Sequence, residues 1–193
     1  MYVSELNLAV DELLGPFERN DQLLYRKATE ISSWTCGQHV SHVLKMNMSI
    51  IDDLILLAYK NLEIRKKIHV TGKASLFFRS LIYDDDKSDD FLPEKPLVIN
   101  SNWLKKTNQE WDNKMSILKE MDISWKNKIL PMPDSTMGYM TGENWIRYIT
   151  MHTYRHISVI NKILSSNKKN VDLLIDQPTD YDMLLRIKSL SMN

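Results

Sequence analysis

Apolar side chains recur at three- and four-residue steps in four stretches of the chain, which is the spacing of one buried face of a helix. These stretches cover roughly residues 2–30, 35–61, 101–121 and 141–165. The chain has only 5 glycines and 6 prolines, so most of its length is free of helix breakers. No stretch shows the clear two-residue alternation of a strand. The pattern predicts an all-α four-helix bundle that forms a single domain over residues 1–193.

Residues that begin or interrupt helices mark the predicted boundaries. Gly15-Pro16 predicts a break in the first helix, because a proline lacks the backbone N–H and clashes with the preceding turn. The N-terminal caps expected for the other three helices are, in chain order, Thr35 or Ser33, Ser101 and Thr141. The buried stripe expected for the second helix comprises Val40, Val43, Leu44, Ile50, Ile51, Leu54, Ile55 and Tyr59.

The connections between the predicted helices are uneven in length. A long link over residues 62–100 allows the second and third helices to be other than antiparallel neighbours. Within it, the run "DDDKSDD" predicts a solvated loop rather than a metal site, because blocks of like charge usually stay hydrated. After Pro178, a short C-terminal helix is predicted from Tyr181 to Leu190.

Composition and charge narrow the classes of partner. With 25 basic and 25 acidic residues the formal net charge is zero, so no net field favours nucleic acid or anionic lipid. The single cysteine rules out an internal disulfide and suits a reducing compartment. The start of the chain lacks the basic region of a signal peptide, and no apolar run is long enough to cross a bilayer. We therefore expect a cytoplasmic protein that binds neither nucleic acid nor membrane.

Two histidines occupy the apolar face of the fourth predicted helix. His152 and His156 fall on the same stripe as Trp145, Ile149 and Ile160. Positions i and i+4 project from one face a turn apart, so both imidazoles can point at one ion. A leucine would pack this stripe without the hydrogen-bond partners that a buried imidazole needs. The pair is a candidate for binding zinc, nickel or a similar ion, and the alternative is a pair of hydrogen-bonded core histidines.

A third ligand would have to come from another helix. The stretch "WTCGQHVSHVLKMN", at the start of the second helix, holds Cys36, His39 and His42. On a helical wheel His42 lies roughly 140° from the centre of the apolar stripe, at about 100° per residue, and His39 lies closer to that centre. Residue types and wheel geometry leave the choice among the three open.

The spacing of these residues resembles that of the DinB-like (YfiT-like) superfamily. In that family the first metal ligand follows a tryptophan by eight residues, as His42 follows Trp34 here. The stretch "MPDSTMGYMTGENWIRYITMHTYRH" places a proline, a glycine and a Thr-x-x-x-Trp start before the HxxxH pair, in the order that introduces the family's last helix. The interval from Pro133 to Gly138 is longer than in the usual form. The resemblance covers the second and fourth helices closely, and the remainder only by helix count.

The resemblance implies a three-histidine centre for a divalent transition metal, formed by His42, His152 and His156, with His39 as a neighbour of the site. Structural zinc sites usually have four protein ligands, whereas a three-ligand site leaves a position for water or substrate. DinB-like proteins include thiol S-transferases, thiol-dependent isomerases and metal-dependent hydrolases. The implied function is an enzyme that activates a low-molecular-weight thiol or water against a small-molecule substrate.

Two other functions stay open on the sequence. One is a non-catalytic, stress-associated bundle with a structural or vestigial metal site. The other is a bis-histidine haem protein, which is disfavoured because histidines on adjacent turns of one helix cannot lie on opposite sides of one iron. A small bundle with 11 methionines and 5 tryptophans is also compatible with a homodimer.

Several residues near the proposed ligands have two interpretations each. Arg155 could steer an anionic substrate or lie on a solvated helix face. Cys36 could be a fourth ligand, a reactive thiol at a helix N-terminus, or a small buried residue. Residues that could line a pocket mouth or pack in the core are Tyr139, Met140 and Trp145.

Overall fold

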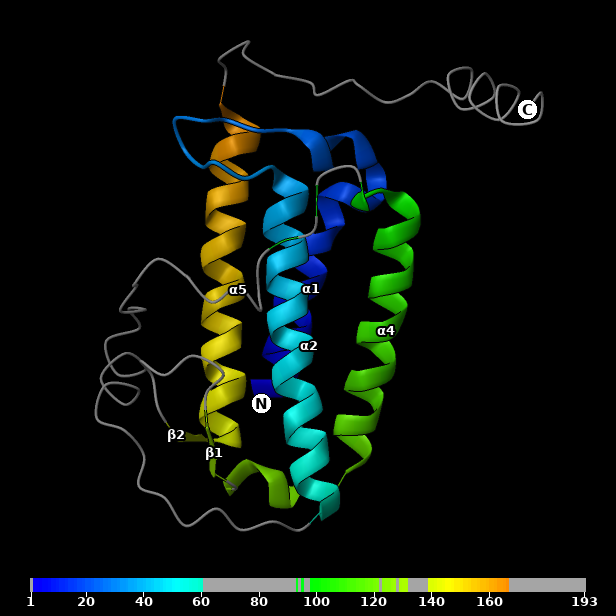
Figure 1. Cartoon of the computed structure of the whole chain (residues 1–193), viewed down its shortest axis with the longest axis vertical. Coiled ribbons are helices and arrows are strands. Elements are labelled where there is room, and N and C mark those ends of the chain that lie inside the picture. The colour runs from blue at the N-terminus through cyan, green and yellow to red at the C-terminus, as the bar shows by residue number, and fades with distance from the viewer. Residues whose placement is uncertain are drawn as a thin grey trace, which may run out of the picture.

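The computed structural model describes residues 2–60, 93, 95, 98–121, 123–127, 129–131 and 139–166. Four long helices lie side by side in one bundle (Figure 1), and they are α1 (Tyr2–Arg19), α2 (Cys36–Lys60), α4 (Ser101–Glu120) and α5 (Gly142–Ser165). The shorter elements are the 3-10 helices η1 (Asp21–Tyr25) and η4 (Ile123–Asn127) and the strands β1 (Ile129–Pro131) and β2 (Tyr139–Thr141). The predicted all-α four-helix bundle is confirmed.

The two strands form a small antiparallel pair that the sequence pattern did not predict. Leu130 lies opposite Met140 in this pair, directly before the start of α5. Each strand has three residues, which is too short for a two-residue alternation to stand out in the sequence.

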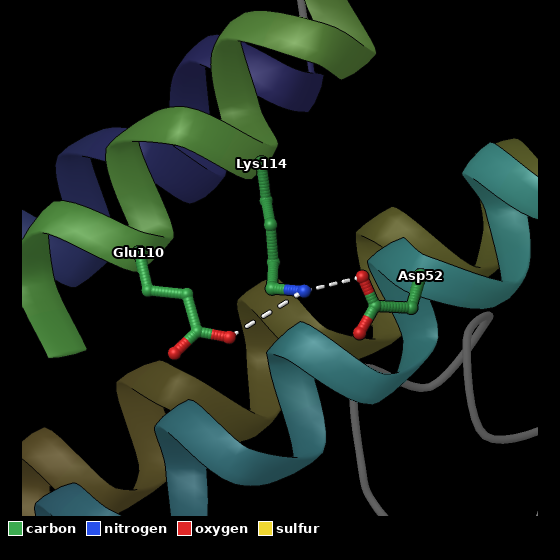
Figure 2. Close-up of polar contacts among 3 residues, drawn as sticks. All are labelled: Asp52, Glu110 and Lys114. Carbon is green, nitrogen blue, oxygen red and sulfur yellow. Dashed lines mark hydrogen bonds and ion pairs between the residues drawn. The ribbon is translucent and has the colours of Figure 1, made fainter.

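The helices run along the bundle in two pairs of like direction. The colour gradient in Figure 1 shows α1 and α5 running one way and α2 and α4 the other. The neighbouring helices α2 and α4 are therefore parallel, as the long link between them allows. An ion pair joins them, in which Lys114 Nζ of α4 lies 2.5 Å from Asp52 Oδ1 of α2 and 3.6 Å from Glu110 Oε1 (Figure 2).

The core fills the space between the four long helices. Its largest fully buried side chains include Phe17 of α1, Leu44 of α2, Trp111 of α4 and Trp145 of α5. The predicted stripe of α2 faces this core except at its end, where Tyr59 is 74% exposed. The inclusion of Tyr59 was wrong, because it lies next to the last residue of the helix, where the bundle no longer covers that face.

The first helix differs from its prediction in both length and continuity. Pro16 lies inside α1 without ending it, and the helix stops at Arg19 rather than near residue 30. Leu13, Leu14 and Phe17, on either side of the proline, are each only 1% exposed. Their packing holds the turn in place although proline removes one backbone hydrogen bond.

Side-chain caps fix where α2, α4 and α5 begin. Thr35 and Gln38 form a reciprocal capping box: Gln38 N donates to Thr35 Oγ1 at 3.1 Å, and Thr35 N donates to Gln38 Oε1 at 3.0 Å. Thr141 caps α5 as predicted, accepting from Asn144 N at 3.3 Å. The expected cap Ser101 was wrong by one residue, because Asn100 Oδ1 accepts the hydrogen bond from Trp103 N.

Two glycines allow close contact at the starts of the two helices that carry the histidines. A Cβ at Gly37 would lie 2.9 Å from the Leu24 carbonyl oxygen, and one at Gly142 would lie 2.4 Å from that of Trp125. These contacts set α2 against η1 and α5 against η4 at distances that a side chain would prevent.

Parts of the sequence-based prediction lie outside the described residues. They are the acidic run within residues 62–92 and the C-terminal helix over residues 181–190. Among the helices that the structure describes, none is both long enough and apolar enough to cross a membrane.

Candidate metal centre

Three histidines from two antiparallel helices meet inside the bundle. His42 lies in the second turn of α2, and His152 and His156 lie one turn apart on α5. Their exposed fractions are 1%, 0% and 4%, respectively. One ring nitrogen of each lies within 4.8 Å of those of the other two, which is close enough for all three to bind one metal ion. Among the described residues they form the only such group of three or more potential ligands.

The distances between the ring nitrogens fit a metal centre better than a hydrogen-bonded cluster. His152 Nε2 lies 3.2 Å from His42 Nε2 and 3.1 Å from His156 Nε2. A neutral imidazole nitrogen carries either one proton or one lone pair, so it can form one good hydrogen bond, not two. Ligand nitrogens about 2.0 Å from a tetrahedral ion lie about 3.3 Å apart. A single ion would therefore fit the two separations at His152 Nε2 with little movement of the rings.

Burial keeps the His156 ring in the form that binds metal. It lowers the pKa of His156 well below the usual value, and the neighbouring His152, His42, His39 and Arg155 lower it further. An uncharged imidazole offers its lone pair to an ion, whereas an imidazolium cannot. The electrostatics of the site therefore favour ligation by His156 at neutral pH.

His42 is buried although the helical wheel places it well to the side of the α2 stripe. Its cover comes in part from Trp34, whose ring centroid lies 5.1 Å from that of His42. The indole also stacks on His156, at 6.4 Å between ring centroids with 13° between the planes. A helical wheel predicts burial only from the position of a residue on its own helix. It therefore cannot show that a side chain from the preceding loop, here Trp34, buries His42.

The loop that carries Trp34 is tied to the ends of both ligand helices. Arg26 Nη1 donates a hydrogen bond to the Leu164 carbonyl oxygen near the end of α5, at 3.0 Å. Cys36 N, at the start of α2, donates to the Arg26 carbonyl oxygen at 2.8 Å. Trp34 itself is half-buried, so it lies between the imidazoles and the solvent.

His39 lies beside the three-histidine group and contacts one of its members. Its Nδ1 is 2.9 Å from His156 Nδ1, and its Nε2 is 2.9 Å from Ser32 Oγ. Burial, followed by the charge of His42, lowers the pKa of His39 from 6.5 to about 4. His39 is thus a neutral neighbour of a candidate ligand, which is the position that the resemblance implied for it.

The other residues with two interpretations divide between the core and the surface. Cys36 is fully buried, and burial raises its pKa to about 12, so the thiol is protonated and packs as a small core residue. Met140 and Trp145 are 0% and 1% exposed and belong to the core, while Tyr139 is half-buried. Arg155 is exposed.

A buried polar pair next to the histidines was missed by the sequence analysis. Asn47 of α2 is 0% exposed, and its Nδ2 donates to Thr153 Oγ1 of α5 at 3.0 Å. The Thr153 hydroxyl in turn donates to the Ile149 carbonyl oxygen at 2.7 Å. The signal was present, because Asn47 interrupts the apolar stripe of its helix just as the two histidines of α5 interrupt theirs.

Comparison of the chain with protein-family models, with curated proteins and with solved structures finds no match. The DinB-like resemblance therefore stays a prediction that rests on residue spacing.

Proposed function

We propose that this chain is a DinB-like metal protein that binds one divalent transition-metal ion through Nε2 of His42, His152 and His156. The observation that carries the proposal is the position of His152 Nε2, which is within 3.2 Å of the two other nitrogens in a site closed to solvent. Two such contacts at one imidazole nitrogen are better satisfied by a shared ion than by protons.

We further propose that the ion serves an enzyme of the thiol S-transferase or hydrolase type. When bound, a metal held by three imidazoles keeps an open position and lowers the pKa of a thiol or water molecule there. The three imidazoles hold and orient the ion, and Trp34 limits the access of bulk water to it. The only cysteine of the chain, Cys36, is buried and protonated, so a thiol reaction would need an external low-molecular-weight thiol.

A second candidate function is a metal site that stabilises the bundle without catalysis. The near-complete burial of all three ligands favours it, since no ligand is more than 4% exposed. A substrate would reach the ion only after a covering group moved, and Trp34 is a covering group in contact with His42 and His156. The two candidates thus agree on the ligands and differ on whether a small molecule can reach the metal.

Metal analysis and cobalt substitution test both candidates. We expect about one equivalent of metal in the purified protein, and none in the triple variant His42→Ala, His152→Ala, His156→Ala. Asn47→Ala, which removes a buried side chain from the same interface but no imidazole, should retain the metal. A wild-type protein that binds no zinc, nickel or cobalt would overturn the proposal.

The visible spectrum of the cobalt protein separates the enzyme from the structural site. Addition of a small thiol should produce a thiolate-to-metal absorption band if the open position can be reached. Turnover in a panel of thiols and electrophiles should then be lost in His152→Ala. An unchanged spectrum together with a large gain in thermal stability on metal binding would favour the structural site.

A further inference from the structure

A line of three polar side chains leads from the candidate metal centre to the loop before α2. His156 Nδ1 is 2.9 Å from His39 Nδ1, and His39 Nε2 is 2.9 Å from Ser32 Oγ. Ser32 Oγ also accepts a hydrogen bond from Trp34 N at 3.1 Å. The line therefore connects α5, α2 and the loop that carries the covering indole.

The protons in this line can be arranged in only two ways if both imidazoles are neutral. In the first, His156 Nδ1–H donates to His39 Nδ1, and His39 Nε2–H donates to Ser32 Oγ. In the second, both directions are reversed, and His156 carries its proton on Nε2. Only the first arrangement leaves the lone pair of His156 Nε2 free, and this is the nitrogen that lies 3.1 Å from His152 Nε2.

We propose that His39 is a positioning residue that, with Ser32 as its acceptor, fixes His156 in the Nδ1–H form and presents its Nε2 to the metal. The inference rests on the proposed metal site for its purpose, but the proton arrangement itself is a property of the metal-free protein. A ligand histidine whose other nitrogen donates to a fixed acceptor is held in one tautomer and one ring orientation. Here the acceptor is a second imidazole rather than a carboxylate or a backbone carbonyl group.

Because the line is buried, the direction of its hydrogen bonds determines which nitrogen of His156 carries the proton. His39 is 5% exposed and His156 is 4% exposed, so water cannot easily replace a lost partner. A buried N–H without an acceptor is costly, so removal of the His39 ring should shift the proton of His156 to Nε2. That shift would block the ligand atom without changing any ligand residue.

Nitrogen NMR of the metal-free protein tests the tautomer directly. Long-range ¹H–¹⁵N spectra distinguish Nδ1–H from Nε2–H imidazoles, and His156→Gln identifies the signals of His156. We expect the Nδ1–H form in the wild type and in His39→Gln, whose amide oxygen can still accept. We expect an increase in the Nε2–H form in His39→Leu and a smaller increase in Ser32→Ala. An Nε2–H form in the wild type, or an unchanged tautomer in both His39→Leu and Ser32→Ala, would overturn the inference.

Metal affinity, measured by competition with a chelating dye, provides the second readout. His39→Leu should bind zinc about 10- to 100-fold more weakly than wild type, and His39→Gln should stay close to wild type. Thr107→Val, a buried polar-to-apolar change on α4, should leave both the affinity and the tautomer unchanged. If His39→Leu does not fold, the variant Ser32→Ala still tests the inference, because Ser32 is only half-buried and its loss should be tolerated. A wild type that binds no metal but has the expected tautomer would overturn the proposed function and leave this inference standing.

Discussion

Helix α2 presents polar side chains to two different neighbours, and the two interfaces treat them in opposite ways. Toward α4, Asp52 meets Lys114 at the surface, with Asp52 54% exposed (Figure 2). Toward α5, His42 and Asn47 meet imidazole and hydroxyl groups at 1% and 0% exposure. The first interface lets water satisfy its charges, whereas the second must satisfy its polar groups internally or with a ligand.

This difference shows which polar contacts carry information about function. A surface ion pair between helices changes the free energy of unfolding only slightly when it forms or is lost. Its presence therefore says little beyond solubility and helix register. A cluster of imidazoles buried in the core lowers the free energy of unfolding unless hydrogen bonds or a ligand compensate for the lost hydration. The α2–α5 interface, rather than the more highly charged α2–α4 interface, is therefore where a ligand is expected.

Acid should break the α2–α5 interface first, and this is the largest expected effect. His39 has a pKa of about 4 in the folded chain against an ordinary value of 6.5, and burial also keeps the pKa of His156 low. Between pH 4 and pH 6.5 the unfolded chain binds more protons than the folded chain. The stability is therefore fully present above pH 6.5 and is lost as the pH falls. His39 should therefore remove about 1.4 kcal/mol of unfolding free energy per pH unit in this window, and His156 should add a loss of the same sign.

Urea unfolding of the metal-free protein at pH 7, 6 and 5 measures this loss. His39→Gln should show a shallower slope, because it removes one of the two titrating groups. Equal stability at pH 7 and pH 5 in the wild type would contradict the expected burial of neutral imidazoles.

Metal should strengthen the same interface by a slightly smaller amount. At a free zinc concentration about 100 times the dissociation constant, the free energy of unfolding should rise by about 2.7 kcal/mol. His152→Ala should abolish the gain, since His152 Nε2 is the atom that contacts both other ligands. Denaturant unfolding with and without zinc measures the difference. Thr150→Val, on the same helix, keeps all three imidazoles and should gain as much as wild type, whereas an equal gain in His152→Ala would exclude this site.

The hydrogen bond between Asn47 and Thr153 should contribute less than the metal but more than a surface contact. Thr153→Val keeps the shape of the side chain and leaves the buried Asn47 amide without its acceptor, at a cost of about 1–3 kcal/mol. Thr150→Val is the matched control, because the Thr150 hydroxyl donates to the Ile146 carbonyl oxygen within α5. Thermal or denaturant unfolding should show a clearly larger loss for Thr153→Val, and equal losses would show that the bond across the interface adds nothing.

The sequence predicted what depends on one helix at a time. Periodicity gave the four helices, and Thr141 gave the start of α5, because capping and amphipathicity are local properties. The same approach failed at Pro16, where packing against other helices holds a turn that the local sequence disfavours. Strands β1 and β2 were missed because their pairing depends on two short segments meeting in space.

The candidate site was predictable only in part for a related reason. The spacing of His152 and His156 fixes their common face, so the pair could be identified within α5. Residue types left Cys36, His39 and His42 open as the third member, and only the resemblance chose His42. The separate role of His39 depends on Ser32 and Trp34 folding over the helix start, which no periodicity encodes.

Lys114→Met should test the α2–α4 side of the comparison and have the smallest effect. Methionine keeps the apolar stem of the side chain, which is 18% exposed, and removes the charge that faces Asp52 and Glu110 (Figure 2). Exposed ion pairs are worth less than about 1 kcal/mol, and salt screens them, so the loss in unfolding free energy should be below that value and smaller still in 1 M sodium chloride. Metal affinity should be unchanged, because the ion pair lies between α2 and α4 and not at the α2–α5 interface. A loss as large as that of Thr153→Val would show that the two faces of α2 are energetically alike, and burial would then no longer distinguish the interface that binds a ligand from the one that does not.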